Sequence, residues 1–231
     1  DQEDHTTLYA AHARFTGPRR LALSTGEVLT ADRVVVAAGA HAVGLPVDGL
    51  REPDPANGLH TSDPVMRLAA LPPRMYVIGG GFVACELAHV FASFGVHVTQ
   101  VQRGPSLLRH HEASIAQRYT QVAANHYDVR LSVTPTAAQR VGDAWRVALE
   151  GSGGPDLVEA EVVLLAVGRR PNTDDLGAAA GGLEVHADGR LVVDAEPRTT
   201  ADAVWALGDV CSPHQLKHVA NHEARIVAHN L

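Results

Sequence analysis

Residues 76–103, with the sequence YVIGGGFVACELAHVFASFGVHVTQVQR, constrain the fold more than any other part of the chain. An apolar run enters three consecutive glycines, a segment with helical periodicity follows, and a second apolar run ends in arginine. Apolar residues that recur every three to four positions predict an amphipathic helix, and short apolar runs bounded by glycine are typical of buried strands. The stretch therefore predicts a strand, a helix and a second strand, the unit that builds parallel sheets.

The predicted helix has an apolar face and a defined end. Gly95 stands where a glycine that ends a helix belongs, and residues 98–101 resume an extended pattern. The side chains expected on the buried face are Val83, Leu87, Val90, Phe91 and Phe94.

The glycine spacing indicates a ligand. Gly79, Gly81 and Ala84 match GxGxxA. The first glycine permits a tight turn, the second lets the backbone approach a pyrophosphate, and the small third residue lets the helix pack closely on the strand. The phosphate then lies at the helix N-terminus, where N–H groups and the helix dipole favour an anion. A dinucleotide site is predicted; the alternative is a glycine-rich turn without a ligand.

The end of the second strand indicates which dinucleotide. An acidic residue there would accept hydrogen bonds from the ribose hydroxyls of NAD, but the chain has Gln102 and Arg103, with Arg109 shortly after. Two guanidinium groups can hold a 2′-phosphate through charge-assisted hydrogen bonds. NADPH is therefore predicted, and the alternative is that both arginines are ordinary solvated side chains.

A second candidate site follows the apolar run VWAL at residues 204–207. If residues 204–207 form a buried strand, Asp209 lies just past its end, and a helix is expected from about Leu216. A carboxylate at such a position can accept hydrogen bonds from ligand hydroxyls, while a helix N-terminus faces an anionic group. The alternative is that Asp209 caps a turn.

The rest of the chain alternates strands and helices. The expected elements, in order, are an antiparallel meander at 8–30, a buried strand at 33–40, a helix at 113–126, a strand at 128–133, a hairpin turning at Gly142 and Asp143, an apolar strand at 161–172 and a strand pair at 191–201. The pattern predicts an α/β protein in which a βαβ domain is inserted between two pieces of another domain.

Composition excludes several classes of protein. A chain of 231 residues that is 45% hydrophobic can bury a core, and its formal charge of -7 disfavours a nucleic-acid surface. No apolar run approaches the roughly 20 residues of a membrane-spanning helix, so we expect no membrane insertion and a cytoplasmic location. Cys85 and Cys211 are too far apart in sequence for a CxxC metal site or a disulfide framework. His214, His218 and His222 recur every four residues without further ligands, so no metal site is expected.

Four segments in this order and spacing resemble the pyridine nucleotide-disulfide oxidoreductases, a family of flavoenzymes: YVIGGGFVACE, AVGRRPN, RTTADAVWALGDV and LKHVANHEARIVAHNL. The resemblance covers nearly the whole chain. It implies a Rossmann-like, three-layer ββα fold with the end of a first FAD segment and a linker at 1–58, an NADPH domain at 59–171 and a second FAD segment at 172–231. It also implies an internal fragment that begins after a CxxxxC redox pair and ends before an interface domain.

The resemblance also implies site residues. For NADPH these are Gly79, Gly81, Phe82, Ala84, Gln102, Arg103, Arg109, Gly168 and Arg169. For FAD they are Ala38, Gly39, Gly208, Asp209, Leu216, Lys217, His218 and Val219. Glu86 corresponds to a glutamate near the flavin and nicotinamide. Phe82 stands where many members have a tyrosine that gates the nicotinamide pocket, and Ala38 departs from the usual run of that segment.

The activity implied is FAD-dependent, NADPH-driven reduction of a small-molecule disulfide by a homodimer, with the redox cysteines and the catalytic His and Glu outside this chain. Within the family, the segments PVMRLAALPPRMYVIGGGF, HVFASFG, RGPSLLR and LKHVAN resemble the enzymes that reduce mycothiol disulfide, and this resemblance implies mycothiol disulfide as the substrate. The alternatives are glutathione or lipoamide disulfide, a related flavoprotein such as an NADH oxidase or ferredoxin reductase, or a nucleotide-binding fragment without turnover.

Overall fold

The computed structural model describes residues 6–151 and 153–231, and the chain divides into two compact units. Unit 1 comprises Asp1–His41 and Arg170–Leu231, and unit 2 is Ala42–Arg169. The chain passes between the units through β5 (Ala40–Ala42) and β14 (Arg169–Pro171), which pair with each other. Unit 2 is thus inserted between two segments of unit 1. The assignment of a cofactor to each unit stays a prediction.

Unit 2 is built on a five-stranded sheet. Its strands, in spatial order, are β6 (Leu59–Thr61), β13 (Val162–Leu165), β7 (Arg74–Ile78), β8 (His97–Gln102) and β9 (Asp128–Leu131). Every neighbouring pair is parallel. All residues of β13 are buried, as expected for a central strand of a parallel sheet that is covered on both faces.

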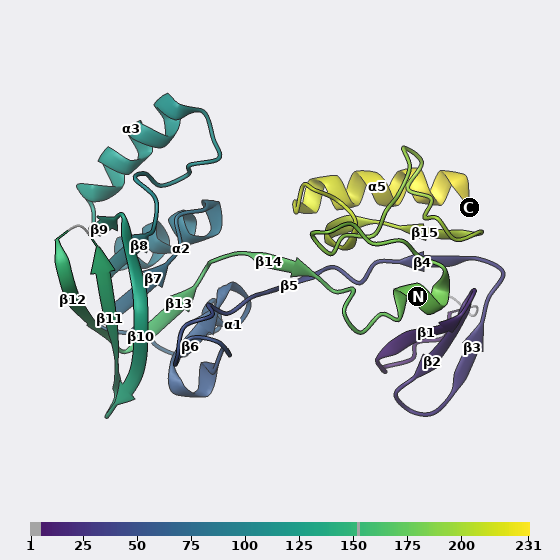
Figure 1. Ribbon diagram of the computed structural model, residues 1–231, viewed down its shortest axis with the longest axis horizontal. Coiled ribbons are helices and arrows are strands. Elements are labelled where there is room, and N and C mark those ends of the chain that lie inside the picture. Colours follow the sequence, from purple (N-terminus) through teal and green to yellow (C-terminus); the bar gives the residue numbers. More distant parts are fainter. Residues whose placement is uncertain (1–5, 152) are drawn as a thin grey trace. The chain divides into compact units, whose positions relative to one another are not determined.

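The two faces of this sheet are covered by different layers (Figure 1). On one face, α2 (Phe82–Ser93) packs its alanines and Phe91 against Met75 and Val77. On the other face, Tyr76 and Ile78 pack against side chains of an antiparallel sheet, β10 (Val133–Val141), β11 (Ala144–Gly151) and β12 (Gly154–Ala160). The short elements η1 (Pro55–Asn57) and α1 (Ser62–Val65) flank β6. The predicted three-layer ββα fold is confirmed.

The predicted β7–α2–β8 unit is confirmed, but the predicted buried face of its helix is wrong in part. The buried residues are Ala84, Cys85, Ala88 and Phe91. Val83, Leu87 and Val90 are half-buried, and the side chain of Phe94, after the last turn, is 68% exposed. Small side chains let the helix axis approach the sheet, so the contact stripe centres on the alanines and the larger apolar residues flank it.

The helix α3 (Ala113–Ala124) begins at Glu112, whose carboxylate accepts a hydrogen bond from Ile115 N–H at 3.2 Å. This is the acceptor that the first turn of a helix needs. Ala123 packs with Cys85 and Leu107, so α3 lies against α2 and the loop that follows β8.

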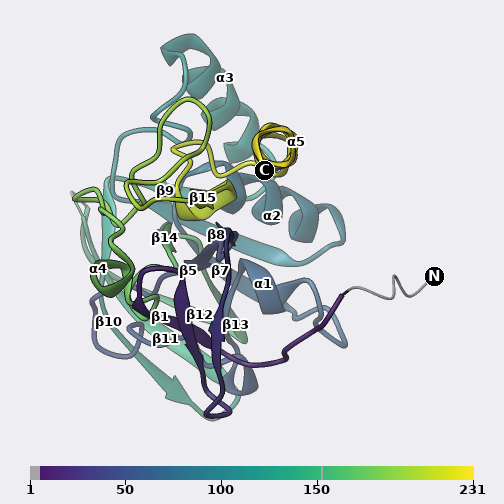
Figure 2. The same ribbon diagram turned by 90° about the vertical axis from the view of Figure 1, so that its right-hand side faces the viewer.

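Unit 1 contains the predicted meander and a parallel strand pair (Figures 1 and 2). The meander is β1 (Ala13–Gly17), β2 (Arg20–Leu23) and β3 (Val28–Thr30), and the parallel pair is β4 (Val34–Val36) with β15 (Val204–Ala206). The remaining elements are α4 (Ala178–Gly181), η2 (Gly208–Val210) and α5 (Lys217–Asn230). The strand pair predicted at 191–201 is wrong, since only isolated bridges form there and Pro197 has no N–H to continue a ladder. Within the described residues, no helix combines the length and apolar character needed to cross a membrane.

Candidate functional site

The glycine turn lies at the carboxyl edge of the sheet in unit 2, between β7 and α2. Gly79 has a φ of 134°, and a Cβ at this position would lie 2.3 Å from the carbonyl oxygen of Ala166. Only glycine fits both conditions. The same Cβ would lie 3.5 Å from Cβ of Ala84, so the small residue at position 84 is what lets the helix start this close to the strand.

At Gly81, unlike at Gly79, a side chain would not clash with the protein. Its φ is -79°, and beyond the adjoining residues no atom lies within 4 Å of the place where its Cβ would be. Gly81 is the N-cap of α2 and provides no side-chain cap, and the first intrahelical hydrogen bond runs from Cys85 N–H to Gly81 O at 3.0 Å. The preceding N–H groups of the helix have no acceptor within it, and N–H groups of this kind are suited to bind a phosphate.

Gln102 and the two arginines lie at the same edge of the sheet, because β8 runs parallel to β7. The Gln102 side chain lies over Gly80, where a Cβ would be 2.5 Å from Gln102 Nε2. Arg103 follows at the strand end and is exposed. The loop then returns to the turn, since Leu108 N–H donates to Gly80 O at 2.7 Å, and Arg109 comes next.

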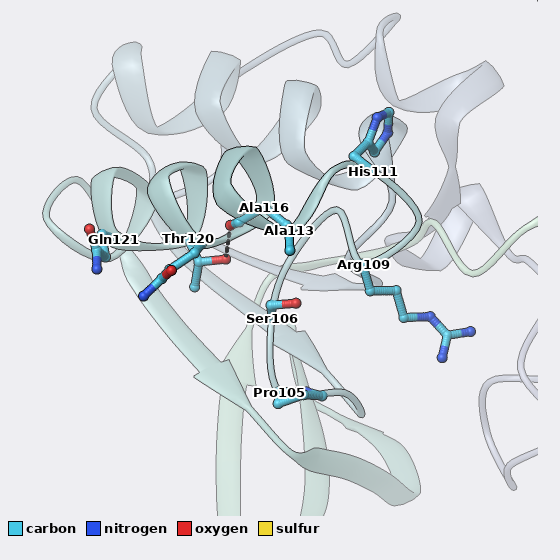
Figure 3. A pocket seen from close by; sticks show the side chains of 9 residues that line it. Pro105, Ser106, Arg109, His111, Ala113, Ala116, Thr120 and Gln121 are labelled. Carbon is cyan, nitrogen blue, oxygen red and sulfur yellow. Dashed lines mark hydrogen bonds between the residues drawn. The ribbon is translucent and has the colours of Figure 1, made fainter.

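A cleft of about 320 Å³ lies between this loop and α3. It is lined by Pro105, Ser106, Arg109, His111, Ala113, Ala116, Gln117, Thr120 and Gln121. Leu107 N–H donates to Thr120 Oγ1 at 3.0 Å and ties the loop to the helix. Figure 3 shows the Arg109 side chain extended from the loop with its guanidinium directed away from α3. Two backbone hydrogen bonds, from the two residues before Arg109, thus tie the loop that carries this positive charge to α3 and to the glycine turn.

The third segment at this edge follows β13, the neighbour of β7. Gly168 has a φ of 141°, and no atom lies within 4 Å of its missing Cβ. Arg169 Nη1 lies 3.5 Å from Asp63 Oδ1, in the first turn of α1. The structure thus brings the three predicted NADPH segments to one edge. Sequence reasoning missed Asp63, because nothing in its local sequence links it to an arginine so far along the chain.

The candidate FAD residues converge in unit 1 at the edge of the β4–β15 pair. Leu207 N–H donates to Val36 O at 3.0 Å, so the segments that follow the two strands start side by side. Gly208 has a φ of 75°, and its N–H donates to Glu223 Oε2 at 2.7 Å. A Cβ on Gly208 would lie 3.4 Å from Cβ of Ala220. The turn that carries Asp209 therefore packs against the first turns of α5.

The helix α5 begins next to Leu216, where the start of a helix was predicted. Leu216 is the N-cap, contributes no side-chain cap and is 46% exposed. The first intrahelical hydrogen bond runs from Ala220 N–H to Leu216 O at 3.1 Å. The N–H groups of Lys217, His218 and Val219 therefore have no acceptor within the helix, which suits an anionic ligand edge.

Two further residues in unit 1 hold the predicted segments in place. Asn172 Nδ2 donates to Ala38 O at 2.7 Å, and Asn172 N–H donates to Gly39 O at 3.0 Å. Glu223 holds the Gly208 turn as described above. Asn172 could have been found from the sequence, because it ends the segment AVGRRPN that carries the family resemblance. Glu223 could not, because a glutamate inside an amphipathic helix does not indicate its hydrogen-bond partner.

The remaining candidates are surface residues and two thiols. Phe82 is 46% exposed and Glu86 is exposed, both in the first turns of α2. Cys85 and Cys211 are both buried and free, in different units. Burial raises the pKa of the Cys85 thiol and raises that of Cys211 to about 12. Across the described residues, no three His, Cys, Asp or Glu side chains are grouped to hold a metal.

Comparison with known proteins identifies relatives along nearly the whole chain. The chain is 44% identical to mycothione reductase from Mycobacterium tuberculosis (strain H37Rv), covering 97% of this chain and 48% of that protein. It is 34% identical to glutathione reductase from Burkholderia cepacia, covering 96% of this chain and 47% of that protein. The chain therefore spans about half the length of these curated relatives.

The fold is also similar to a solved structure. The HOCl-induced flavoprotein disulfide reductase RclA from Escherichia coli matches with a TM-score of 0.85 and 26% identity, over 96% of this chain and 49% of that one. A family model described as pyridine nucleotide-disulphide oxidoreductase matches residues 2–224. This chain belongs to the pyridine nucleotide-disulphide oxidoreductase family.

Proposed function

We propose that the whole protein is an FAD-dependent, NADPH-driven disulfide oxidoreductase and that its substrate is mycothiol disulfide. Members of the family such as mycothione and glutathione reductase use FAD and NADPH. The observation that carries the proposal is the convergence, at one edge of a parallel sheet, of a glycine turn, an uncapped helix N-terminus and two arginines. The substrate rests on the 44% identity to mycothione reductase.

In unit 2, the chain's own groups would bind and orient NADPH. The backbone of residues 79–81 and the first turn of α2 would hold the pyrophosphate, because the missing Cβ of Gly81 leaves room for it. Arg103 and Arg109 would hold the 2′-phosphate, which the uncharged Gln102 does not repel. Gly168, Arg169, Phe82 and Glu86 would lie toward the nicotinamide.

In unit 1, the chain's own groups would hold FAD at the edge of β4 and β15. Asp209 would accept hydrogen bonds from ribityl hydroxyls, and Ala38 and Gly39 would line the ligand with their backbone. The N–H groups of residues 217–219 would stabilise negative charge placed before α5. When bound, FAD and NADPH supply hydride and electron transfer, and the residues here contribute position and charge.

The 231 residues contain two cysteines, and these lie in separate units. A dithiol that passes electrons to a substrate needs two thiols within reach of each other. We therefore propose that this chain by itself binds nucleotides and does not reduce disulfides. A yellow preparation of the chain with NADPH-dependent disulfide reductase activity would refute this part.

For the whole protein, we propose a cytoplasmic homodimer.

The test of the substrate uses the complete protein. It would be assayed for NADPH consumption with mycothiol disulfide, glutathione disulfide and lipoamide at matched concentrations. We expect kcat/KM for mycothiol disulfide to exceed the other two by at least about a hundredfold, the scale that differential binding of distinct polar substrates reaches. Preference for glutathione disulfide or lipoamide would reject mycothiol disulfide while leaving the oxidoreductase class in place. No NADPH consumption with any disulfide would reject the class.

A further inference from the structure

The glycine turn of unit 2 is held from inside the protein by Gln100, a residue of β8 that is 0% exposed. Gln100 Nε2 donates a hydrogen bond to Gly79 O at 2.9 Å and lies 3.7 Å from Cys85 Sγ. Gln100 Oε1 accepts a hydrogen bond from Tyr127 OH at 3.0 Å. Both ends of the amide are thus used, and one end bonds to the backbone of the turn.

The hydrogen bonds extend from the turn to α2 and α3. Tyr119, on α3, donates from its OH to Cys85 O at 3.1 Å. Cys85 belongs to the first turns of α2, and its Sγ lies 3.8 Å from Gly80 O. The turn, the start of α2 and α3 are therefore linked by one group of polar side chains, two buried and two half-buried, which we call the Gln100 network: Cys85, Gln100, Tyr119 and Tyr127.

The side-chain amide of Gln100 is unusual, because it is a buried polar group inside a strand that has neighbours on both sides. Val98, which precedes it on the same face of β8, and Val101, which follows it, are apolar and buried, and an apolar residue is the ordinary choice for a fully buried position. Burying an amide costs free energy unless its donors and acceptor are satisfied. Here the donor satisfies Gly79 O, whose position fixes the peptide plane between Gly79 and Gly80.

We propose that Gln100 is a positioning residue for dinucleotide binding, an inference that rests on the proposed function. By fixing Gly79 O, Gln100 orients the backbone of residues 79–81 and the N–H groups that would face the pyrophosphate. Within the described residues, the Gln100 side chain bonds to Gly79, Cys85 and Tyr127 and not to Arg103 or Arg109, which follow β8. Loss of Gln100 therefore weakens ligands that carry a pyrophosphate and spares a ligand that carries only the adenosine 2′-phosphate.

The experiment compares two ligands on the full 231-residue chain and its variants. Gln100→Met keeps the side-chain volume and removes the hydrogen bonds. Calorimetric titration with NADPH should give a Kd about tenfold higher than for the unaltered chain, a change that corresponds to one hydrogen bond. NMR titration with adenosine 2′-monophosphate should give a change below about twofold, because that ligand lacks the pyrophosphate.

A matched pair of tyrosine variants controls for general damage. Tyr127→Phe removes the hydroxyl that orients Gln100, and we expect the Kd for NADPH to rise about threefold. Tyr76 is also buried in unit 2, and its hydroxyl has no hydrogen-bond partner among the described residues. Tyr76→Phe should therefore leave the Kd of both ligands unchanged.

The outcomes are distinguishable. An equal loss of both ligands in folded Gln100→Met, or no loss of NADPH, overturns the inference and leaves the proposed function standing. If the unaltered chain binds neither ligand, the proposed NADPH site fails and the inference fails with it. If Gln100→Met does not fold, the comparison of Tyr127→Phe with Tyr76→Phe decides, and equal NADPH affinities in these two overturn the inference.

Discussion

Substitution by alanine should have different consequences at Gly79 and at Gly81. At Gly79 the added methyl group would clash with the backbone and affect stability, whereas at Gly81 it would affect ligand binding. At Gly79 an alanine would have a φ of 134° and a Cβ 2.3 Å from a carbonyl oxygen. We expect Gly79→Ala to lower the free energy of unfolding by more than about 2 kcal/mol. Gly81→Ala should change it by less than about 1 kcal/mol, since φ is ordinary and the space is open.

For Gly81→Ala, the predicted effect is on ligand binding and not on stability. In Gly81→Ala the new methyl group occupies the space proposed for the pyrophosphate, so the Kd for NADPH should rise by at least about tenfold in a folded protein. Urea unfolding and calorimetric titration of the two variants measure both quantities. Unchanged NADPH affinity in Gly81→Ala would contradict the proposed phosphate position.

The two thiols should be inert in the folded chain. Burial raises the pKa of Cys85 and raises that of Cys211 to about 12, so both thiols are less ionised than an exposed cysteine at the same pH. We expect Ellman's reagent to modify neither thiol within minutes under native conditions and both thiols in denaturant. Rapid modification of either thiol in the folded chain would show a reactive cysteine that this structure does not contain.

At the scale of elements, Glu161, which immediately precedes β13, links that strand to the start of β7. Glu161 lies between β12 and β13; its carboxylate accepts from Arg74 N–H at 2.9 Å and pairs with Arg74 Nη2 at 2.7 Å. These hydrogen bonds hold the pKa of Glu161 below its ordinary value of 4.5. A carboxyl group whose pKa is lower in the folded state stabilises that state above its unfolded pKa, and the stabilisation is lost as pH falls through the folded pKa.

Glu161→Gln should therefore lower the free energy of unfolding by about 1 kcal/mol at pH 7, a modest value because the pair is partly exposed. The difference from the unaltered chain should shrink as the pH falls below 4.5, the ordinary pKa of this group. Urea unfolding at several pH values measures it. Glu150→Gln, at an exposed position of β11, is the matched control and should change the free energy of unfolding at pH 7 by less than about 0.5 kcal/mol. A constant difference across pH would contradict the ion pair.

Elements with strong periodicity were predictable, and pairings between distant elements were not. The β7–α2–β8 unit and the hairpin at Gly142 follow from spacing and turn chemistry that act over a few residues. The buried face of α2 was mispredicted, because apolar size favours Val and Leu whereas close helix packing favours Ala. Asp63 and Glu223 could not be found from sequence, since each acts on a segment that only the fold brings near. Gln100 likewise looks like any polar residue in a strand until its partner Gly79 is seen.

At the scale of the whole molecule, each unit presents a parallel-strand edge that carries a glycine turn with positive φ and a helix N-terminus without a side-chain cap. Ligands of open α/β sheets bind at the carboxyl ends of the strands, which is where these features lie. This arrangement supports two nucleotide sites in one chain, one on each unit. We propose that Arg103, at the end of β8, and Arg109, in the loop that follows, make the site of unit 2 prefer NADPH over NADH.

The most direct test of this account is calorimetric titration of the chain with NADPH and with NADH. We expect one NADPH per chain, bound at least about tenfold more tightly than NADH, with the difference abolished when Arg103 and Arg109 are both replaced by Gln. Gly81→Ala should weaken both nucleotides, since both carry the pyrophosphate. Equal affinities of the unaltered chain for NADPH and NADH, or no binding of either, would contradict the account.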